Sequence, residues 1–136
     1  MSTPSSAAKR QPALARPSSS IVLLSPTNEV LLLRRVQTSS SFASAYVFPG
    51  GNLDAKHDGE IPPPESLARH RDGPAYRLGA IRECFEETGI LLAKKEGKLV
   101  DLTKGERDEA RKKVHSGEIL FGDFLREIGC EPDVGK

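Results

Sequence analysis

The chain has 136 residues and a formal net charge of +1, with 37% hydrophobic and 5% aromatic residues. This length allows one domain with a modest core. The near-neutral charge does not indicate an extended nucleic-acid or membrane surface, and no apolar run approaches the roughly 18 residues that span a bilayer. Cys84 and Cys130 are too few for a disulfide framework and indicate a reducing, intracellular compartment.

The N-terminal stretch is rich in serine, alanine and proline and contains no acidic residue before Glu29. This composition is acid-poor like that of a transit peptide, but its prolines are incompatible with an amphipathic helix. We therefore expect residues 1–18 to form a disordered tail and residues 19–134 to form the domain.

Two β-branched and leucine-rich runs follow the tail, at Ser20–Ser25 and Val30–Val36. The residues between them include proline, threonine and asparagine, which favour a turn, so the pattern predicts a β-hairpin. The polar stretch 37–44 should be a loop. Ala45–Phe48 should then be a short strand that leads into a double glycine.

The stretch 54–73 contains three consecutive prolines, which exclude a helix or a central strand at that point. We expect an irregular surface insertion that serves as a lid or a specificity loop. A helix should begin near Pro74 or Ala75, because proline suits a first turn. It should end near Thr88, with Gly89 as the left-handed residue that closes it.

Shorter elements are expected after this helix. Leu91–Ala93 and Lys98–Leu102 are strand candidates separated by a Glu-Gly turn. Two helices should follow them. The first is the strongly charged Lys104–His115, and the second is Glu118–Ile128, which carries its apolar residues on one face.

The long helix carries the most informative stretch of the chain, Arg82-Glu83-Cys84-Phe85-Glu86-Glu87-Thr88-Gly89-Ile90. At about 100° per residue its three glutamates share one edge of the helix, opposite its apolar residues. Like charges at this spacing repel, and a divalent cation would reverse that repulsion. Such oxygen ligands suit Mg²⁺ or Mn²⁺, although a glutamate-rich face is more often solvated surface.

Two neighbouring features favour the metal interpretation. Arg82 is a permanent cation whose planar fork can hold a carboxylate in one orientation. Gly50 and Gly51 follow a short apolar run, and a double glycine permits positive φ and a close approach of the backbone to a ligand. Considered alone, the double glycine would more often be an ordinary turn.

Together these residues resemble the Nudix box, whose second half reads R-E-U-x-E-E-x-G-U with U aliphatic. Arg82–Ile90 matches its fixed positions, with Cys84 in place of an aliphatic residue, and Gly51 matches the opening glycine. Phe48–Asp54 is similar to the acyl-CoA diphosphatase branch, nucleoside diphosphate-linked moiety X motif 19. The resemblance covers about residues 20–134 and implies an α/β fold, a Nudix-type α/β/α sandwich with a mixed sheet.

The resemblance implies a hydrolase that splits the diphosphate bond of a nucleoside diphosphate linked to another moiety. It implies Mg²⁺ or Mn²⁺ as cofactor, with Glu83, Glu86, Glu87 and Gly51 as metal ligands. The three glutamates and Arg82 would form the catalytic site. Coenzyme A or acyl-CoA is the expected small-molecule substrate, giving 3′,5′-ADP and 4′-phosphopantetheine or its acyl form. No nucleic-acid or membrane partner is expected.

Arg34, Arg35 and Gly50 are candidate substrate-binding residues. The two arginines follow a leucine run and would reach a phosphate, although charges at a strand end are more often only solvated. Two alternative functions stay open. The chain is a catalytically silent module that keeps the fold, or it acts on ADP-ribose, nucleotide sugars or capped RNA. The sequence does not decide the oligomeric state.

The chain departs from the family pattern between Gly51 and Arg82, where 30 residues stand, 52 to 81. The insertion 54–73 therefore lies inside the box, and the first glutamate of the box has no assignable counterpart. His57 occupies its nominal place, with Asp58 beside it. In the family that glutamate pairs with the box arginine, so its loss threatens the orientation of Arg82.

The resemblance also bears on completeness and location. Several strands follow the box helix in the family, whereas two helices follow it here. We therefore expect a partial domain, incomplete at the C-terminus and only marginally stable, because unpaired sheet edges favour association. The branch points to peroxisomes or mitochondria, but the chain shows no clear targeting signal for either.

Overall fold

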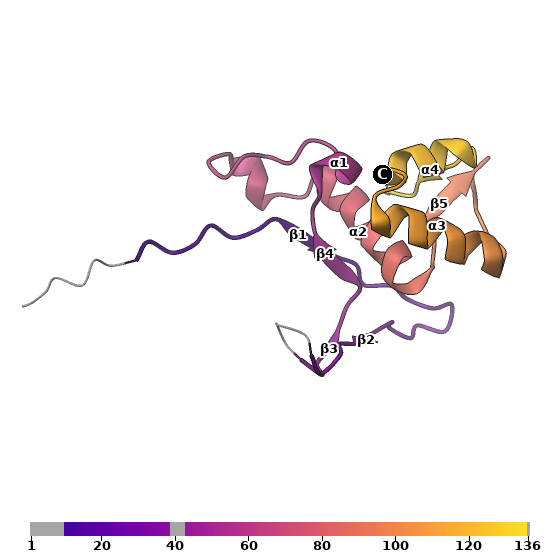
Figure 1. The fold of residues 1–136 in the computed structure, drawn as a ribbon, viewed down its shortest axis with the longest axis horizontal. Helices are drawn as coiled ribbons and strands as arrows, with labels where there is room; N and C mark the ends of the chain where they lie inside the picture. The colour runs from indigo at the N-terminus through magenta and orange to yellow at the C-terminus, as the bar shows by residue number, and fades with distance from the viewer. Residues whose placement is uncertain (1–9, 39–42, 136) are drawn as a thin grey trace, which may run out of the picture.

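The computed structural model describes residues 10–38 and 43–135, and Figure 1 shows a long helix between a group of strands and a group of shorter helices. Within these residues, every helix is too short or too polar to cross a bilayer. The elements in chain order are β1 (Ser18–Ser20), β2 (Leu33–Arg34), β3 (Tyr46–Val47), β4 (Gly50–Asn52), α1 (Ala55–Asp58), the 3-10 helix η1 (Leu67–His70), α2 (Pro74–Thr88), β5 (Ala93–Lys95), β6 (Lys98–Leu99), α3 (Lys104–Ser116), α4 (Phe121–Glu127) and β7 (Glu131–Pro132).

The long helix α2 has the bounds that its end residues predict. It begins with Pro74 in the first turn and ends at Gly89, which has the left-handed φ of 79°. The N–H of Gly89 donates to the carbonyl of Phe85 at 2.8 Å and closes the last turn. One face of the helix, with Ile81 and Phe85, is buried.

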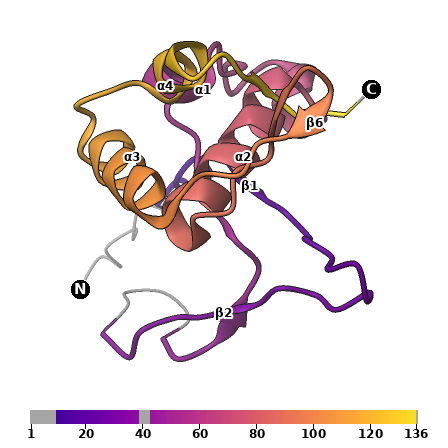
Figure 2. The ribbon, with the colours of Figure 1, turned by 90° about the vertical axis from the view of Figure 1, so that its right-hand side faces the viewer.

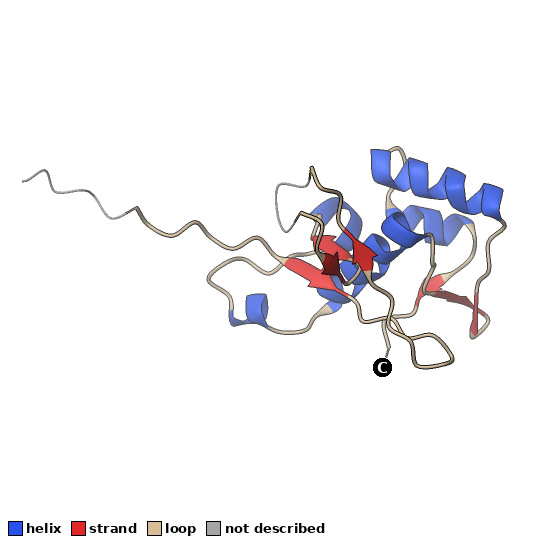
Figure 3. Ribbon diagram, turned by 90° about the horizontal axis from the view of Figure 1, so that it is seen from below, coloured by secondary structure: helices blue, strands red, loops and turns tan. Residues whose placement is uncertain are grey.

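The strands confirm the predicted α/β class but are arranged differently from a single mixed sheet. Among the described residues they form three small antiparallel sheets, β1–β4, β2–β3 and β6–β5–β7. Figure 3 shows these short strands in red beside the blue helices. The strands predicted at 91–93 and 98–102 begin later or end earlier than expected, as β5 and β6.

The predicted hairpin between Ser20–Ser25 and Val30–Val36 forms only around its turn. Its ladder is reduced to the bridge between Leu24 and Val30 and the adjacent backbone hydrogen bonds. Ser20 instead pairs with Gly50 in the β1–β4 sheet, and β2 pairs with β3. The prediction of a longer hairpin is therefore wrong, because the first run pairs with β4 and the second pairs with β3.

The ends of the chain and its loops also refine the predicted bounds. The first nine residues of the predicted tail and residues 39–42 of the predicted loop lie outside the described residues. Residues 10–17 carry no secondary structure, and β1 begins at Ser18. The insertion 54–73 is less irregular than expected, because it contains α1 and η1.

The main core lies between α2 and the elements that follow it. The rings of Phe85, Phe121 and Phe124 form a cluster with centroid separations of 5.5 to 6.3 Å. Figure 2 shows α3 and α4 close to α2, while β2 lies apart from them. Burying these aromatic rings supplies the largest apolar contribution to stability. The core thus fixes the position of α2, which carries the acidic residues.

Candidate active site

Arg82 is the buried centre of the candidate site, with 4% of its surface exposed. Its Nε and Nη2 bond to the two carboxylate oxygens of Asp58 at 2.8 and 2.9 Å. Its Nη1 bonds to Glu83 Oε1 at 2.9 Å and to Glu86 Oε1 at 3.0 Å. Burial alone would lower the pKa of Arg82, but the carboxylates raise it above its ordinary value. Arg82 is therefore a fixed cation that orients three acidic groups.

Asp58 is the carboxylate that pairs with Arg82, in the role for which the sequence offered no assignable glutamate. It is 3% exposed, and its Oδ2 also accepts the N–H of Asp54 at 2.9 Å. The short helix α1 turns Asp58 toward α2 and leaves His57 facing α4, where its Nδ1 accepts the N–H of Phe121 at 3.1 Å. We expected the departure from the box to disturb the orientation of Arg82. A residue of the insertion, Asp58, instead holds Arg82 in place.

The double glycine brings strand β4 very close to its neighbours. A Cβ at Gly51 would lie 2.6 Å from Cδ of Glu83, and a Cβ at Gly50 would lie 2.3 Å from the carbonyl oxygen of Ser19. Neither glycine has a positive φ. The glycines are therefore required for close approach, and the positive φ that the sequence suggested is absent.

Two of the three glutamates face the same cavity. This cavity, of about 1260 Å³, is lined by Glu83 and Glu87 together with Arg34, Arg35, Gly50 and Gly51. It is larger than a typical small-ligand pocket of roughly 300–1,000 Å³. The structure thus brings all three predicted substrate-binding residues together with three of the four predicted metal ligands, Glu83, Glu87 and Gly51.

Glu86 is held differently from the other two glutamates. Its Oε1 accepts from Arg82, and its Oε2 lies 3.1 Å from Nδ1 of His115 on α3. Arg111 of the same helix donates to the backbone carbonyl of Glu86 at 2.7 and 3.0 Å. Sequence reasoning missed these two α3 residues, since no local pattern links them to the box helix.

The electrostatics of the cavity favour a bound cation. Desolvation raises the pKa of Glu83, although Arg82 partly opposes the increase. Desolvation also raises the pKa of Glu87, and the Gly50 N–H, which donates to Glu87 Oε2 at 3.0 Å, partly opposes it. Carboxylates that are costly to ionise together gain most from a positive ion between them.

The residues present fit a hard divalent cation. Mg²⁺ usually takes one or two carboxylates and completes its octahedron with waters and substrate phosphates. Glu83 and Glu87 provide that number of carboxylates on the cavity wall. Across residues 10–38 and 43–135, no group of three or more His, Cys, Asp or Glu side chains has a metal-binding arrangement, so the predicted three-glutamate cluster is not assembled in this side-chain arrangement.

A glycine-bearing strand thus lies against an acidic helix, with a buried arginine bonded to the helix carboxylates. The NUDIX domain family model matches residues 14–124, and the chain belongs to this family. The predicted superfamily is therefore confirmed.

Relatives and a solved structure agree with this assignment. The chain is 28% identical over 148 residues to acyl-coenzyme A diphosphatase NUDT19 of Xenopus laevis, covering 78% of this chain and 39% of that protein. It is 36% identical over 80 residues to putative nudix hydrolase 7 of Caenorhabditis elegans, covering 58% of this chain and 23% of that protein. It thus spans well under half the length of these relatives.

The crystal structure of a NUDIX hydrolase from Alicyclobacillus acidocaldarius is similar, with a TM-score of 0.61 and 25% identity over 88% of this chain and 57% of that chain. The similarity covers most of the described residues. The predicted Nudix-type α/β fold is therefore confirmed, with three small antiparallel sheets among the described residues in place of the expected mixed sheet.

Proposed function

We propose that this chain carries the active site of a metal-dependent diphosphatase that cleaves a nucleoside diphosphate linked to another moiety, with coenzyme A or acyl-CoA as substrate. One observation carries the proposal. Glu83 and Glu87 face a cavity that also contains the backbone of Gly50 and Gly51 and the side chain of Arg34. The likeness to an acyl-coenzyme A diphosphatase supports the choice of substrate.

A diphosphate resists hydrolysis because its negative charges repel an incoming hydroxide. Mg²⁺ or Mn²⁺, held by Glu83, Glu87 and Gly51, would supply charge neutralisation and a more acidic water. One of the glutamates would accept the proton of that water. Arg34 and Arg35, which line the same cavity, would bind the phosphate oxygens.

Arg82 and Glu86 complete the proposed catalytic set. Arg82 bonds to Glu83 and Glu86 at the same Nη1, so it fixes the spacing of these two carboxylates. Asp58 fixes Arg82 in turn through two hydrogen bonds. This chain of contacts preorganises the acidic edge of α2 before any ligand arrives.

Hydrolysis assays with Mg²⁺ test the proposal directly. The protein should convert coenzyme A to 3′,5′-ADP and 4′-phosphopantetheine, and Glu87→Gln should reduce kcat by roughly 10³-fold, because the variant lacks the charge that acts in the transition state. Glu65→Gln, in an exposed part of the insertion, is the matched control and should keep full activity. Full activity in a Glu86→Gln, Glu87→Gln double variant would refute the assignment.

A silent nucleotide-binding module is the second candidate, and one observation favours it. Glu86 is engaged by Arg82 and His115, so the three glutamates do not converge on one point. Parallel assays with ADP-ribose and a dinucleoside polyphosphate separate the candidates. Ligand-induced increases in Tm without turnover of any of these substrates would support the module.

A further inference from the structure

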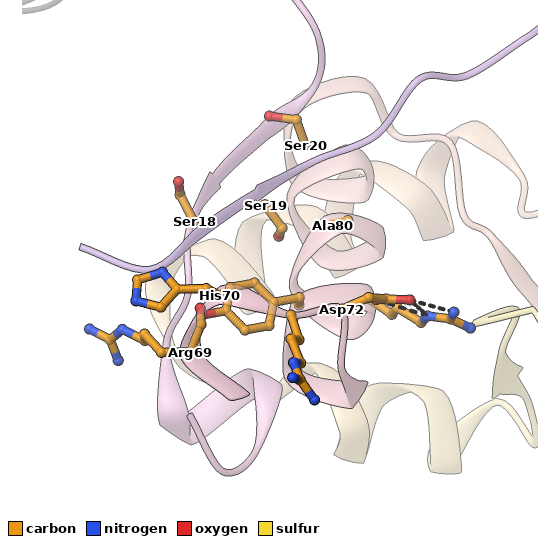
Figure 4. Close-up of a pocket in the computed structure, with 10 residues that line it drawn as sticks. Ser18, Ser19, Ser20, Arg69, His70, Asp72 and Ala80 are labelled. Atoms are coloured by element: carbon orange, nitrogen blue, oxygen red, sulfur yellow. Dashed lines mark hydrogen bonds and ion pairs between the residues drawn. The ribbon is translucent and has the colours of Figure 1, made fainter. Parts of the chain in front are cut away.

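A second cavity adjoins the first and is lined by the insertion, α2 and β1. Its volume is about 380 Å³. Figure 4 shows it in close-up. Residues 69–72 come from the insertion, and Tyr76, Arg77 and Ala80 come from α2. The remaining wall is Ser18–Ser20, which also lines the cavity of Glu83 and Glu87. Strand β1 is therefore common to both cavities.

The charge of this second cavity is positive. Arg77 is paired with Asp72, whose two oxygens lie 3.1 and 2.9 Å from its Nε, so this pair adds no net charge. Arg69 and Arg71 remain, with His70 between them in sequence. The side chains of Arg71 and His70 have no hydrogen-bond or ion-pair partner within residues 10–38 and 43–135.

The backbone that carries these cations is held in place. The hydroxyl of Tyr76 donates to the carbonyl of Arg69 at 2.6 Å, and the guanidinium of Arg69 donates to the carbonyl of Pro62 at 2.6 Å. The N–H of Arg71 donates to Ala68 at 3.2 Å and closes η1. The free side chain of Arg71 is thus presented by a fixed backbone, which lowers the entropy cost of binding an anion.

Ser19 adds a polar group that lacks a partner. Its Oγ is buried and has no hydrogen bond within the part of the chain that the structure describes. In Figure 4 the Ser19 side chain points the opposite way from Ser18 and Ser20, as alternation along a strand requires. A buried hydroxyl without a partner is uncommon and favours a bound water or ligand beside it.

We infer that this second cavity binds a phosphate monoester on the nucleoside end of the substrate, so that the insertion selects substrates with a third phosphate. The inference rests on the proposed function, because the shared wall of β1 lets one ligand reach both cavities. A monoester dianion matches the unpaired guanidinium of Arg71, because arginine suits its oxygens by bidentate geometry.

Calorimetry with 3′,5′-ADP, 5′-AMP and inorganic phosphate tests the site without requiring turnover. The wild-type protein should bind 3′,5′-ADP about tenfold more tightly than 5′-AMP, in line with a charge-assisted contact. Arg71→Gln should remove most of this preference, since the side chain is exposed and its loss leaves the fold intact. Lys112→Gln, which removes an equal charge from the exposed surface of α3, should retain it.

Three outcomes overturn the inference. The first is an equal affinity of the wild-type protein for 3′,5′-ADP and 5′-AMP. The second is an equal effect of Arg71→Gln and Lys112→Gln, which would indicate only general electrostatic attraction. The third is binding of inorganic phosphate that Arg71→Gln abolishes while the preference between the nucleotides persists, which would indicate a free-phosphate site.

Kinetics separate this inference from the proposed function. The ratio of KM for 3′-dephospho-coenzyme A to KM for coenzyme A should fall about tenfold in Arg71→Gln, and Arg71→Lys should restore part of it. Turnover of neither substrate, with the calorimetric preference intact, would refute the proposed function alone. Turnover of both with an unchanged ratio would refute the phosphate site alone.

Discussion

The helical part of the molecule and its N-terminal strands are stabilised in contrasting ways. The helical part, α2 to β7, buries a cluster of three phenylalanine rings and the apolar residues around them. The strand part exposes its large apolar side chains, with Val22, Leu24, Val36 and Tyr46 between 56 and 69% exposed. Figure 1 shows β2 and β3 extending away from the helices.

The acidic site lies where these two parts meet. Its carboxylates belong to α2, which the core fixes, and its glycines belong to β4, which is held by polar contacts such as the N–H of Gly50 to Glu87. The core thus holds one wall of the site, and polar contacts hold the other. The contrast therefore predicts that stability and catalysis respond to different residues.

The largest expected effect tests the core itself. Phe121→Ala should lower the free energy of unfolding by about 3–5 kcal/mol, because it removes a fully buried ring and leaves a cavity. Leu24→Ala, in the exposed strand part, should change it by less than about 0.5 kcal/mol. Urea unfolding measures both. Equal losses would show that the strand part is as well packed as the core.

The next largest effect tests the connection between the insertion and α2. Asp58→Asn should cost about 3 kcal/mol, because it leaves the buried guanidinium of Arg82 with one charged partner fewer. Asp72→Asn breaks the exposed pair with Arg77 and should cost less than about 1 kcal/mol. If the two variants unfold at the same urea concentration, Asp58 is not a buried anchor.

The smallest expected effect concerns Glu87 and pH. The pKa of Glu87 in the folded protein is raised above its ordinary value of 4.5, so ionising this carboxyl group lowers the free energy of unfolding. This loss of stability is present at pH values above the folded-state pKa. Glu87→Gln keeps an acceptor for Gly50 but lacks the charge, so without metal it should be slightly more stable than wild type at pH 7. The difference should vanish as pH falls below about 4.

Addition of Mg²⁺ should reverse the order of stability at pH 7, since only the wild-type site gains from the cation. Thermal melts of the two proteins with and without the metal check this. A wild-type protein whose Tm rises no more than that of Glu87→Gln would contradict the role of Glu87 as a ligand.

Features encoded by neighbouring residues could be predicted from the sequence. The bounds of α2 follow from Pro74 and Gly89, whose conformational preferences act within one turn. The acidic edge of the helix follows from spacing alone. The family also emerged from a contiguous motif at Arg82–Ile90.

Features set by contacts between distant residues could not be predicted. The pairing of β1 with β4 joins segments about thirty residues apart and displaced the expected hairpin. Asp58 bonds to Arg82 only because α1 turns it toward α2. The length of the insertion changes the spacing of the motif, so this pair could not be assigned from the sequence. His115 reaches Glu86 from a helix whose sequence reads as ordinary charged surface.

The close approach of Gly51 to Glu83 has a consequence for sequence variation. A methyl group at position 51 would displace the flexible end of Glu83 and would leave the backbone and the aromatic core untouched. Gly51→Ala should therefore leave the Tm of the chain unchanged but move the carboxylate of Glu83 out of its position in the site.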